Sequence, residues 1–134
     1  MQKINQIQTF ALILLTFALQ ACQHNPIAMA ETPNQRVGAI LQVYNVALES
    51  AADIVQDGTL PGEFRATVQR IALETGPIVA GLEDAWLEYE RARILLERGE
   101  TPAQRLAIVA ANLEQWLTRG EEALLRLAAA IEQK

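Results

Sequence analysis

The sequence predicts an all-α protein, and three observations support this fold class. Three long stretches repeat their apolar residues at spacings of three and four, which is the period of an amphipathic helix. Turn-forming segments that contain Gly and Pro, at 57–62 and 98–102, separate these stretches. The sequence shows no alternating strand pattern. Because short turns make consecutive helices antiparallel neighbours, we expect an up-down-up three-helix bundle.

Two similar segments mark the expected starts of the first and third helices. They read "ETPNQR" at 31–36 and "ETPAQR" at 100–105. Each places Thr at the N-cap, Pro at the first helical position and Gln at the third, which is the capping-box arrangement. An internal duplication is an alternative interpretation, but the residues downstream align poorly. We therefore expect two independent helix starts, capped by Thr32 and Thr101.

The first helix is expected to continue from its cap to the turn at 57–62, over about 23 residues and roughly 35 Å. Its predicted core stripe is Val37, Leu41, Tyr44, Leu48, Ala51 and Val55, widened by Ile40, Ala47 and Ile54.

The middle helix has the longest apolar stripe and a proline inside it. The stripe is Phe64, Val68, Ile71, Thr75, Ile78, Leu82, Ala85, Tyr89, Ala92 and Leu96. Pro77 lacks an amide hydrogen and crowds the carbonyl of Leu73, which costs a helix interior about 3 kcal/mol. Since the stripe keeps its phase across Pro77, we expect a helix that is kinked or broken there. A complete break would make four helices.

The third helix carries the stripe Leu106, Val109, Leu113, Leu117, Leu124, Leu127 and Ile131. Gly120 lies in its interior, at a cost of about 1 kcal/mol relative to Ala. The segment 123–131 is apolar on more than one face. Contact with a partner, a second copy or a bilayer surface would explain this pattern, and so would a slim Ala-rich bundle; the sequence leaves both open.

The N-terminal residues have the build of an export signal. Lys3 precedes the apolar segment 10–19, which only Thr16 interrupts. A membrane-spanning helix needs roughly 20 apolar residues, so this segment is too short to be one. We interpret it as the apolar region of a signal peptide.

The residues behind the apolar segment, Leu19, Gln20, Ala21 and Cys22, resemble the lipobox of bacterial lipoproteins. Leu19 and Ala21 match the family pattern, while Gln20 departs from it. In that family the cysteine thiol receives a diacylglycerol and the chain is cut just before the cysteine. The resemblance implies a signal peptide at 1–21, lipid on Cys22 as the only bound group, and no other cofactor.

The same resemblance implies a location. Residues 22–31 would form a flexible tether, and 32–134 the helical domain. Gln23 follows Cys22, and by resemblance to lipoprotein sorting the absence of Asp there implies the outer membrane, on its periplasmic face. The membrane would then be a partner through the N-terminal lipid.

A second cleavage signal competes with the lipobox. Ala28, Met29 and Ala30 form an A-x-A site, and cleavage there would release a soluble protein without Cys22. Cleavage sites normally follow closely behind the apolar segment, as Cys22 does and Ala30 does not. We therefore expect processing at Cys22.

Several kinds of chemistry lack the residues they need. The only histidine is His24 in the tether, and the only serine is Ser50 in the first helix, so a Ser-His-Asp site or a His-based metal site is excluded. The net charge is −5 and the basic residues do not cluster, which argues against nucleic-acid binding. We expect no catalytic residues and no metal site.

Asp84 and Glu88 are the one acidic pair with helical spacing that we considered for chemistry. They could hold a hard cation or act as acid and base. We favour a solvated helix face, with ion pairs such as Glu88 with Arg91 and Glu90 with Arg93.

The helical domain contains four large amphipathic side chains, two tyrosines and two tryptophans. Tyr44 and Tyr89 fall on the predicted core stripes, which explains them structurally. Trp86 and Trp116 lie beside their stripes, so each either flanks the core or serves as an exposed anchor for a partner. We take Trp86 and Trp116 as candidate partner-binding residues.

The whole chain resembles the small Ala-rich helical lipoproteins of bacterial genomes and prophages, which mostly have no assigned activity. We expect a non-enzymatic lipoprotein whose domain binds another protein, associates with itself or supports an envelope assembly. One alternative is a soluble exported binding or inhibitor protein cut after Ala30. Another, implied by the prophage resemblance alone, is a lipoprotein that acts in phage exclusion or lysis.

Overall fold

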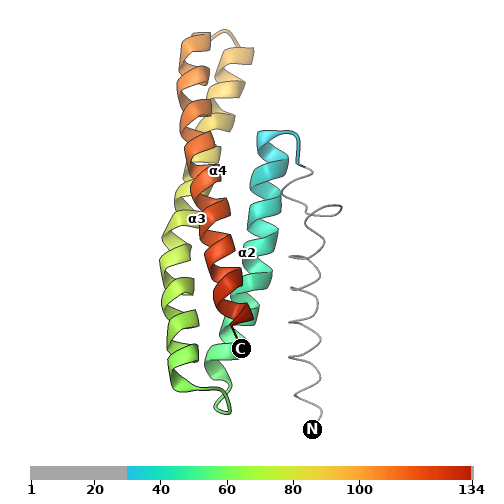
Figure 1. The fold of residues 1–134 in the computed structure, drawn as a ribbon. Coiled ribbons are helices and arrows are strands. Elements are labelled where there is room, and N and C mark those ends of the chain that lie inside the picture. Colours follow the sequence, from blue (N-terminus) through green and yellow to red (C-terminus); the bar gives the residue numbers. More distant parts are fainter. Residues whose placement is uncertain (1–29, 134) are drawn as a thin grey trace.

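The computed structural model describes residues 30–133, which form three helices and no strand. They are α2 (Pro33–Gln56), α3 (Gly62–Glu97) and α4 (Ala103–Glu132). The helices pack side by side, joined by short turns, and α3 and α4 continue past the start of α2 (Figure 1). The prediction of an all-helical protein is confirmed. α3 is a single helix through Pro77, so the alternative of a complete break with four helices does not occur in residues 30–133.

The start of α2 has the predicted capping box. The backbone N–H of Gln35 donates to the hydroxyl oxygen of Thr32 at 3.3 Å, and the Gln35 amide oxygen accepts the Thr32 N–H at 3.1 Å. The same amide oxygen also accepts the N–H of Glu31 at 3.0 Å. Because amides at a helix start have no partner within the helix, these bonds fix where α2 begins.

The start of α4 differs from the prediction that Thr101 caps it. Pro102 takes the N-cap position with ψ 152°, and no side chain caps the helix. The reason lies in the end of α3, where Gly99 has φ +72° and the Glu100 N–H donates to the Leu95 carbonyl at 2.9 Å. This Schellman turn brings the chain out of α3 directly before Thr101. The similar segments therefore share a sequence but not a structure.

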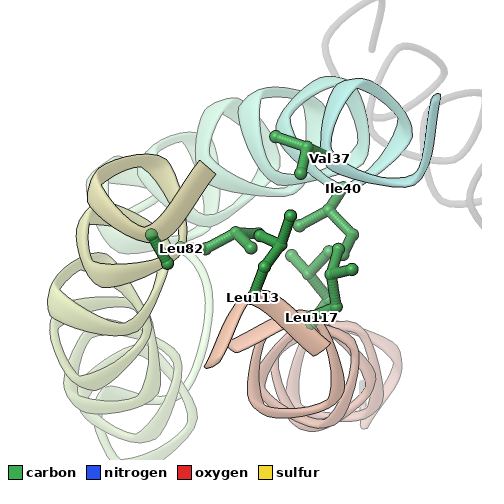
Figure 2. Close-up of a cluster of buried hydrophobic side chains, with 7 residues drawn as sticks. Val37, Ile40, Leu82, Leu113 and Leu117 are labelled. Atoms are coloured by element: carbon green, nitrogen blue, oxygen red, sulfur yellow. The ribbon is translucent and has the colours of Figure 1, made fainter. Parts of the chain in front are cut away.

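The core consists of two clusters, each with residues from all three helices. The upper cluster contains Val37, Ile40, Leu82, Ala85, Leu113, Leu117 and Leu124. Figure 2 shows side chains of this cluster converging from the three helices. The lower cluster contains Ala47, Ala51, Ile54, Val68, Leu127, Ala130 and Ile131. Small residues in the lower cluster allow the helices to lie close together.

The predicted stripe matches the buried residues best on α4, and only the stripe of α2 includes an exposed residue. Every predicted stripe residue of α4 is buried except Leu106, which is half-buried. On α2 the prediction for Leu48 is wrong, because this side chain is 39% exposed. The buried face of α2 includes Ile40, Ala47 and Ile54, and Leu48, one residue after Ala47, points about 100° away from it.

Gly120 has a packing role that the helix-propensity cost did not reveal. It is buried, and a Cβ placed on it would lie 3.3 Å from Leu82 Cδ2 and 3.6 Å from Ile40 Cγ2. The missing side chain therefore leaves room for Leu82 and Ile40 in the upper cluster.

None of the three helices is long and apolar enough to cross a membrane.

The two threonines allow a matched test of the helix starts. Thr32→Ala should lower the free energy of unfolding by about 1 kcal/mol, because it removes the N-cap hydrogen bond. Thr101→Ala should change it by less than about 0.5 kcal/mol, since Thr101 does not cap α4. Urea unfolding followed by circular dichroism measures both. Equal losses in the two variants would contradict the observed difference between the helix starts.

Candidate protein-binding surface

The four aromatic residues singled out in the sequence surround the upper cluster. Trp86 and Tyr89 lie on α3, Trp116 on α4 and Tyr44 on α2, and all four are half-buried against the cluster. Each ring therefore has one part in the core and another part at the surface. The structure brings both candidate partner-binding tryptophans to one end of the core.

Trp116 packs on the backbone of α3 at Gly81. A Cβ on Gly81 would overlap the indole ring, with Trp116 Cε3 only 2.9 Å away. The guanidinium of Arg119 lies over the same ring, 5.1 Å from its centroid, at a distance typical of a cation–π contact. Gly81 was missed by sequence reasoning, because an isolated glycine in a helix does not indicate which side chain it admits.

Trp86 connects α3 to the first turn of α2. Its indole N–H donates to the amide oxygen of Asn34 at 2.8 Å. Because this donor is already used, a partner would contact Trp86 through the apolar part of its ring. The hydrogen bond also holds the ring in place, and a fixed aromatic ring loses little conformational freedom when it binds.

An acidic and basic network continues along α3 from this point. Arg93 pairs with Glu90 at 3.0 Å, which confirms the predicted pair, and also with Glu97. The hydrogen bond from Arg93 lowers the pKa of Glu90 below its ordinary value, and a hydrogen bond from Asn34 contributes. Asn34 therefore contacts both Trp86 and Glu90.

Arg36 attaches the start of α2 to α4. Its Nη1 lies 2.9 and 2.8 Å from the two carboxylate oxygens of Glu114, and its Nη2 lies 3.2 Å from Glu121. The hydrogen bond that Arg36 donates to Glu114 is the main reason that the pKa of Arg36 is raised, and the bond it donates to Glu121 adds to this. Sequence periodicity could not reveal these pairs, because their members lie far apart in the chain.

The acidic pair Asp84 and Glu88 lies on the surface of α3. Glu88 pairs with Arg105 of α4 at 3.0 Å, so the predicted pair with Arg91 is wrong. The reason is that α4 brings Arg105 within reach. Asp84 is exposed and makes no ion pair within residues 30–133. That same part of the chain has no group of three or more His, Cys, Asp or Glu side chains that could hold a metal ion.

The residues of the predicted export and lipid signals, Leu19, Ala21 and Cys22, lie outside the described residues. Ala30 is described and lies two residues before Thr32, the N-cap of α2. The chain from Cys22 therefore joins the bundle where Asn34 and Arg36 attach α2 to its neighbours. We call Tyr44, Trp86, Tyr89 and Trp116 together the aromatic surface. This surface and the junction lie at the same end of α2.

Gly81 and Gly38 allow a test of the Trp116 contact. Gly81→Ala should lower the free energy of unfolding by about 1–3 kcal/mol, because the added methyl overlaps the Trp116 ring. Gly38→Ala adds the same methyl at an exposed helix position with nothing within 4 Å, and should raise it by roughly 0.5–1 kcal/mol. Urea unfolding gives the free energy of unfolding of both variants, and so shows whether steric crowding or helix propensity dominates at each glycine. Stabilisation by both substitutions would mean that Trp116 does not pack on Gly81.

The lowered pKa of Glu90 predicts a pH-dependent contribution to stability. A carboxyl group whose pKa falls on folding stabilises the fold above its ordinary pKa, and this contribution is lost as the pH falls through the lowered value. Glu90→Gln should therefore be less stable than the unmodified protein at pH 7, and the difference should shrink in acid below about pH 4.5.

Urea unfolding at a series of pH values measures this difference. Glu49→Gln is the control, because Glu49 is exposed on α2 and forms no ion pair within residues 30–133, and it should match the unmodified protein at neutral pH. A difference for Glu90→Gln that stays constant from pH 7 to pH 3 would contradict the assignment.

The chain was compared with known protein families, with curated proteins and with solved structures, and no match was found in any of the three.

Proposed function

We propose that the protein is a non-enzymatic lipoprotein of the bacterial cell envelope, anchored in the outer membrane by lipid on Cys22. Its helical domain lies on the periplasmic side and binds another protein or supports an envelope assembly. The observation that carries the proposal is the lipobox-like segment Leu19 to Cys22, which begins at the last residue of the apolar segment 10–19. Residues 1–21 are removed, 22–31 form the tether, and 32–134 form the domain.

The start of the folded domain is compatible with such a tether. The capping box at Thr32 and the ion pairs of Arg36 fix the first turn of α2 on the bundle. Nine residues from Cys22 to Ala30 span roughly 30 Å when extended. The domain therefore stands away from the bilayer, with its aromatic surface near the end of the tether.

Trp86 and Trp116 are the residues we assign to partner binding on this surface. Both are half-buried, and internal contacts hold both in place: Asn34 holds Trp86, and Gly81 and Arg119 surround Trp116. Interfaces gain most of their affinity from a few large, rigid anchors, and tryptophan is enriched among them. Catalysis is not part of the proposal.

The proposal takes the helices to run up-down-up, with a bend in α3 at Pro77. Pro77 has no N–H to offer the Leu73 carbonyl, and it lies on the exposed side of α3, where water can take the place of that donor. We take the bend to be small, because α3 remains one helix from Gly62 to Glu97.

A soluble exported binding protein is the second candidate, because Ala28 and Ala30 form an A-x-A cleavage site. Its mature chain would start at Glu31 and would keep the capping box of α2. The two candidates differ in the mass of the mature chain and in its attachment to the membrane.

The intact mass of the protein purified from bacterial membranes in detergent tests the proposal. We expect a chain that begins at Cys22 and carries two or three acyl chains. Cys22→Ala should remove the lipid mass and release the protein from the membrane fraction, because the thiol is the attachment point. Ala28→Arg, which disrupts only the A-x-A site, should change neither. A bare chain that begins at Glu31, and that Ala28→Arg abolishes, would overturn the proposal.

A further inference from the structure

The outer face of α3 carries an apolar row that the bundle does not use. Ala66, Leu73, Ala80 and Leu87 are exposed and follow one another at intervals of seven residues. Leu73 is 70% exposed and Leu87 is 54% exposed. A seven-residue apolar repeat is the pattern of a helix that packs along a second helix. Exposed apolar residues that share one face of a folded protein indicate an interaction surface.

A shallow depression lies at one end of this row. It is lined by Ala66, Gln69, Arg70, Leu73 and Glu74, all from α3. The first four have the spacing i, i+3, i+4 and i+7, which is the set of residues that forms a hole for a side chain of a facing helix. The depression therefore fits a single large apolar side chain.

Charged residues beside the row identify the helix that fits it. Pro77 lies at the centre of five positions spaced seven residues apart, and the other four carry charges. These are Glu63 and Arg70 before it and Asp84 and Arg91 after it, so the charges alternate in sign along the helix. In a symmetric antiparallel pair of helices, a row of residues that flanks the contact on one helix lies beside the same row of the second copy. With Pro77 at the centre, Arg70 then faces Asp84 of the second copy, and Glu63 faces Arg91. Both pairs are of opposite charge.

The bundle itself leaves most of these charges unpaired. Glu63, Asp84 and Arg91 have no ion-pair partner in the part of the chain that the structure describes, and Arg70 pairs only with exposed Glu74 of its own helix. All four side chains are available for contact with another molecule.

The same register also fits the apolar residues by size. Leu73 lies within one residue, about 1.5 Å along the helix, of the level of Ala80 of the second copy, and Leu87 lies equally close to the level of Ala66. Each large side chain meets a small one, as close packing requires. Leu87 of each copy reaches the depression lined by Ala66 and Leu73 of the other.

We propose that two copies of this chain dock antiparallel along the outer face of α3 and form a symmetric dimer. Leu73 and Leu87 fill the space over Ala80 and Ala66, and the Arg70–Asp84 and Glu63–Arg91 pairs fix the register. The dimer uses no residue of the tether and no residue of the aromatic surface, so it does not depend on the proposed lipid anchor.

Native mass spectrometry of the full-length protein, purified from cells in detergent, counts the chains directly. We expect a dimer. Leu73→Gln should leave only monomer at micromolar concentration, because it places a polar amide at the centre of the contact. Leu125→Gln is the matched control, since Leu125 is 71% exposed on α4, and it should remain dimeric. Circular dichroism verifies that both variants keep their helices, as expected for exposed positions.

Charge reversal tests the register. Arg70→Glu or Asp84→Arg alone places like charges opposite each other twice in the symmetric dimer, and each should raise the dissociation constant about tenfold or more. The double variant with both reversals restores opposite charges and should recover the dimer. A monomeric unmodified protein, a dimer that survives Leu73→Gln, or a double variant weaker than either single one would overturn the proposal.

The same spectra give the mass of each chain, which separates this proposal from the lipoprotein proposal. A dimer of chains without lipid would count against the anchor alone. A lipid-bearing monomer would count against the α3 contact alone.

Discussion

The reciprocal contact between α3 and α4 is the constraint on which the rest of the structure depends. Trp116 of α4 lies on Gly81 of α3, while Leu82 of α3 lies against Gly120 of α4. Each large side chain thus occupies the space left by a glycine on the other helix. Two glycines weaken the helices by roughly 1 kcal/mol each, and close packing of the large side chains offsets that cost. The relative position of α3 and α4 follows from this contact.

The position of α2, and with it the start of the folded domain, follows from the same contact. Ile40 of α2 packs beside Gly120, and Arg36 reaches two carboxylates of α4 one turn on either side of Leu117. Asn34 joins the first turn of α2 to Trp86. The aromatic surface and the start of the domain are therefore parts of one packed unit, and a change at either glycine would disturb both.

Sequence periodicity predicted the helices well, because spacings of three and four, capping residues and glycine turns are local properties. On α4 it predicted every large buried side chain and missed only the small Gly120, Ala123 and Ala130. It also placed Leu48 in the core, because α2 is apolar around much of its circumference and only the neighbouring helices select the buried face. The predicted cap at Thr101 and the predicted ion pair of Glu88 with Arg91 were wrong for a similar reason. The turn at the end of α3 decides how α4 begins, and Arg105 of α4 pairs with Glu88. The candidate tryptophans were found from residue type alone, but their partners Asn34 and Gly81 needed the fold.

The two proposals together restrict how the protein would lie on a membrane. Two copies anchored in the same leaflet can be related only by a twofold axis along the membrane normal, whereas an antiparallel pair of α3 helices has its twofold axis perpendicular to the helices. Both conditions hold only when α3, about 54 Å long by its rise per residue, lies parallel to the bilayer. The starts of α2 then point in opposite directions along the surface, and tethers of roughly 30 Å let both reach the lipid. Anchoring would also raise the effective concentration of the two copies, so a short apolar row with four ion pairs could pair on the membrane more readily than in solution.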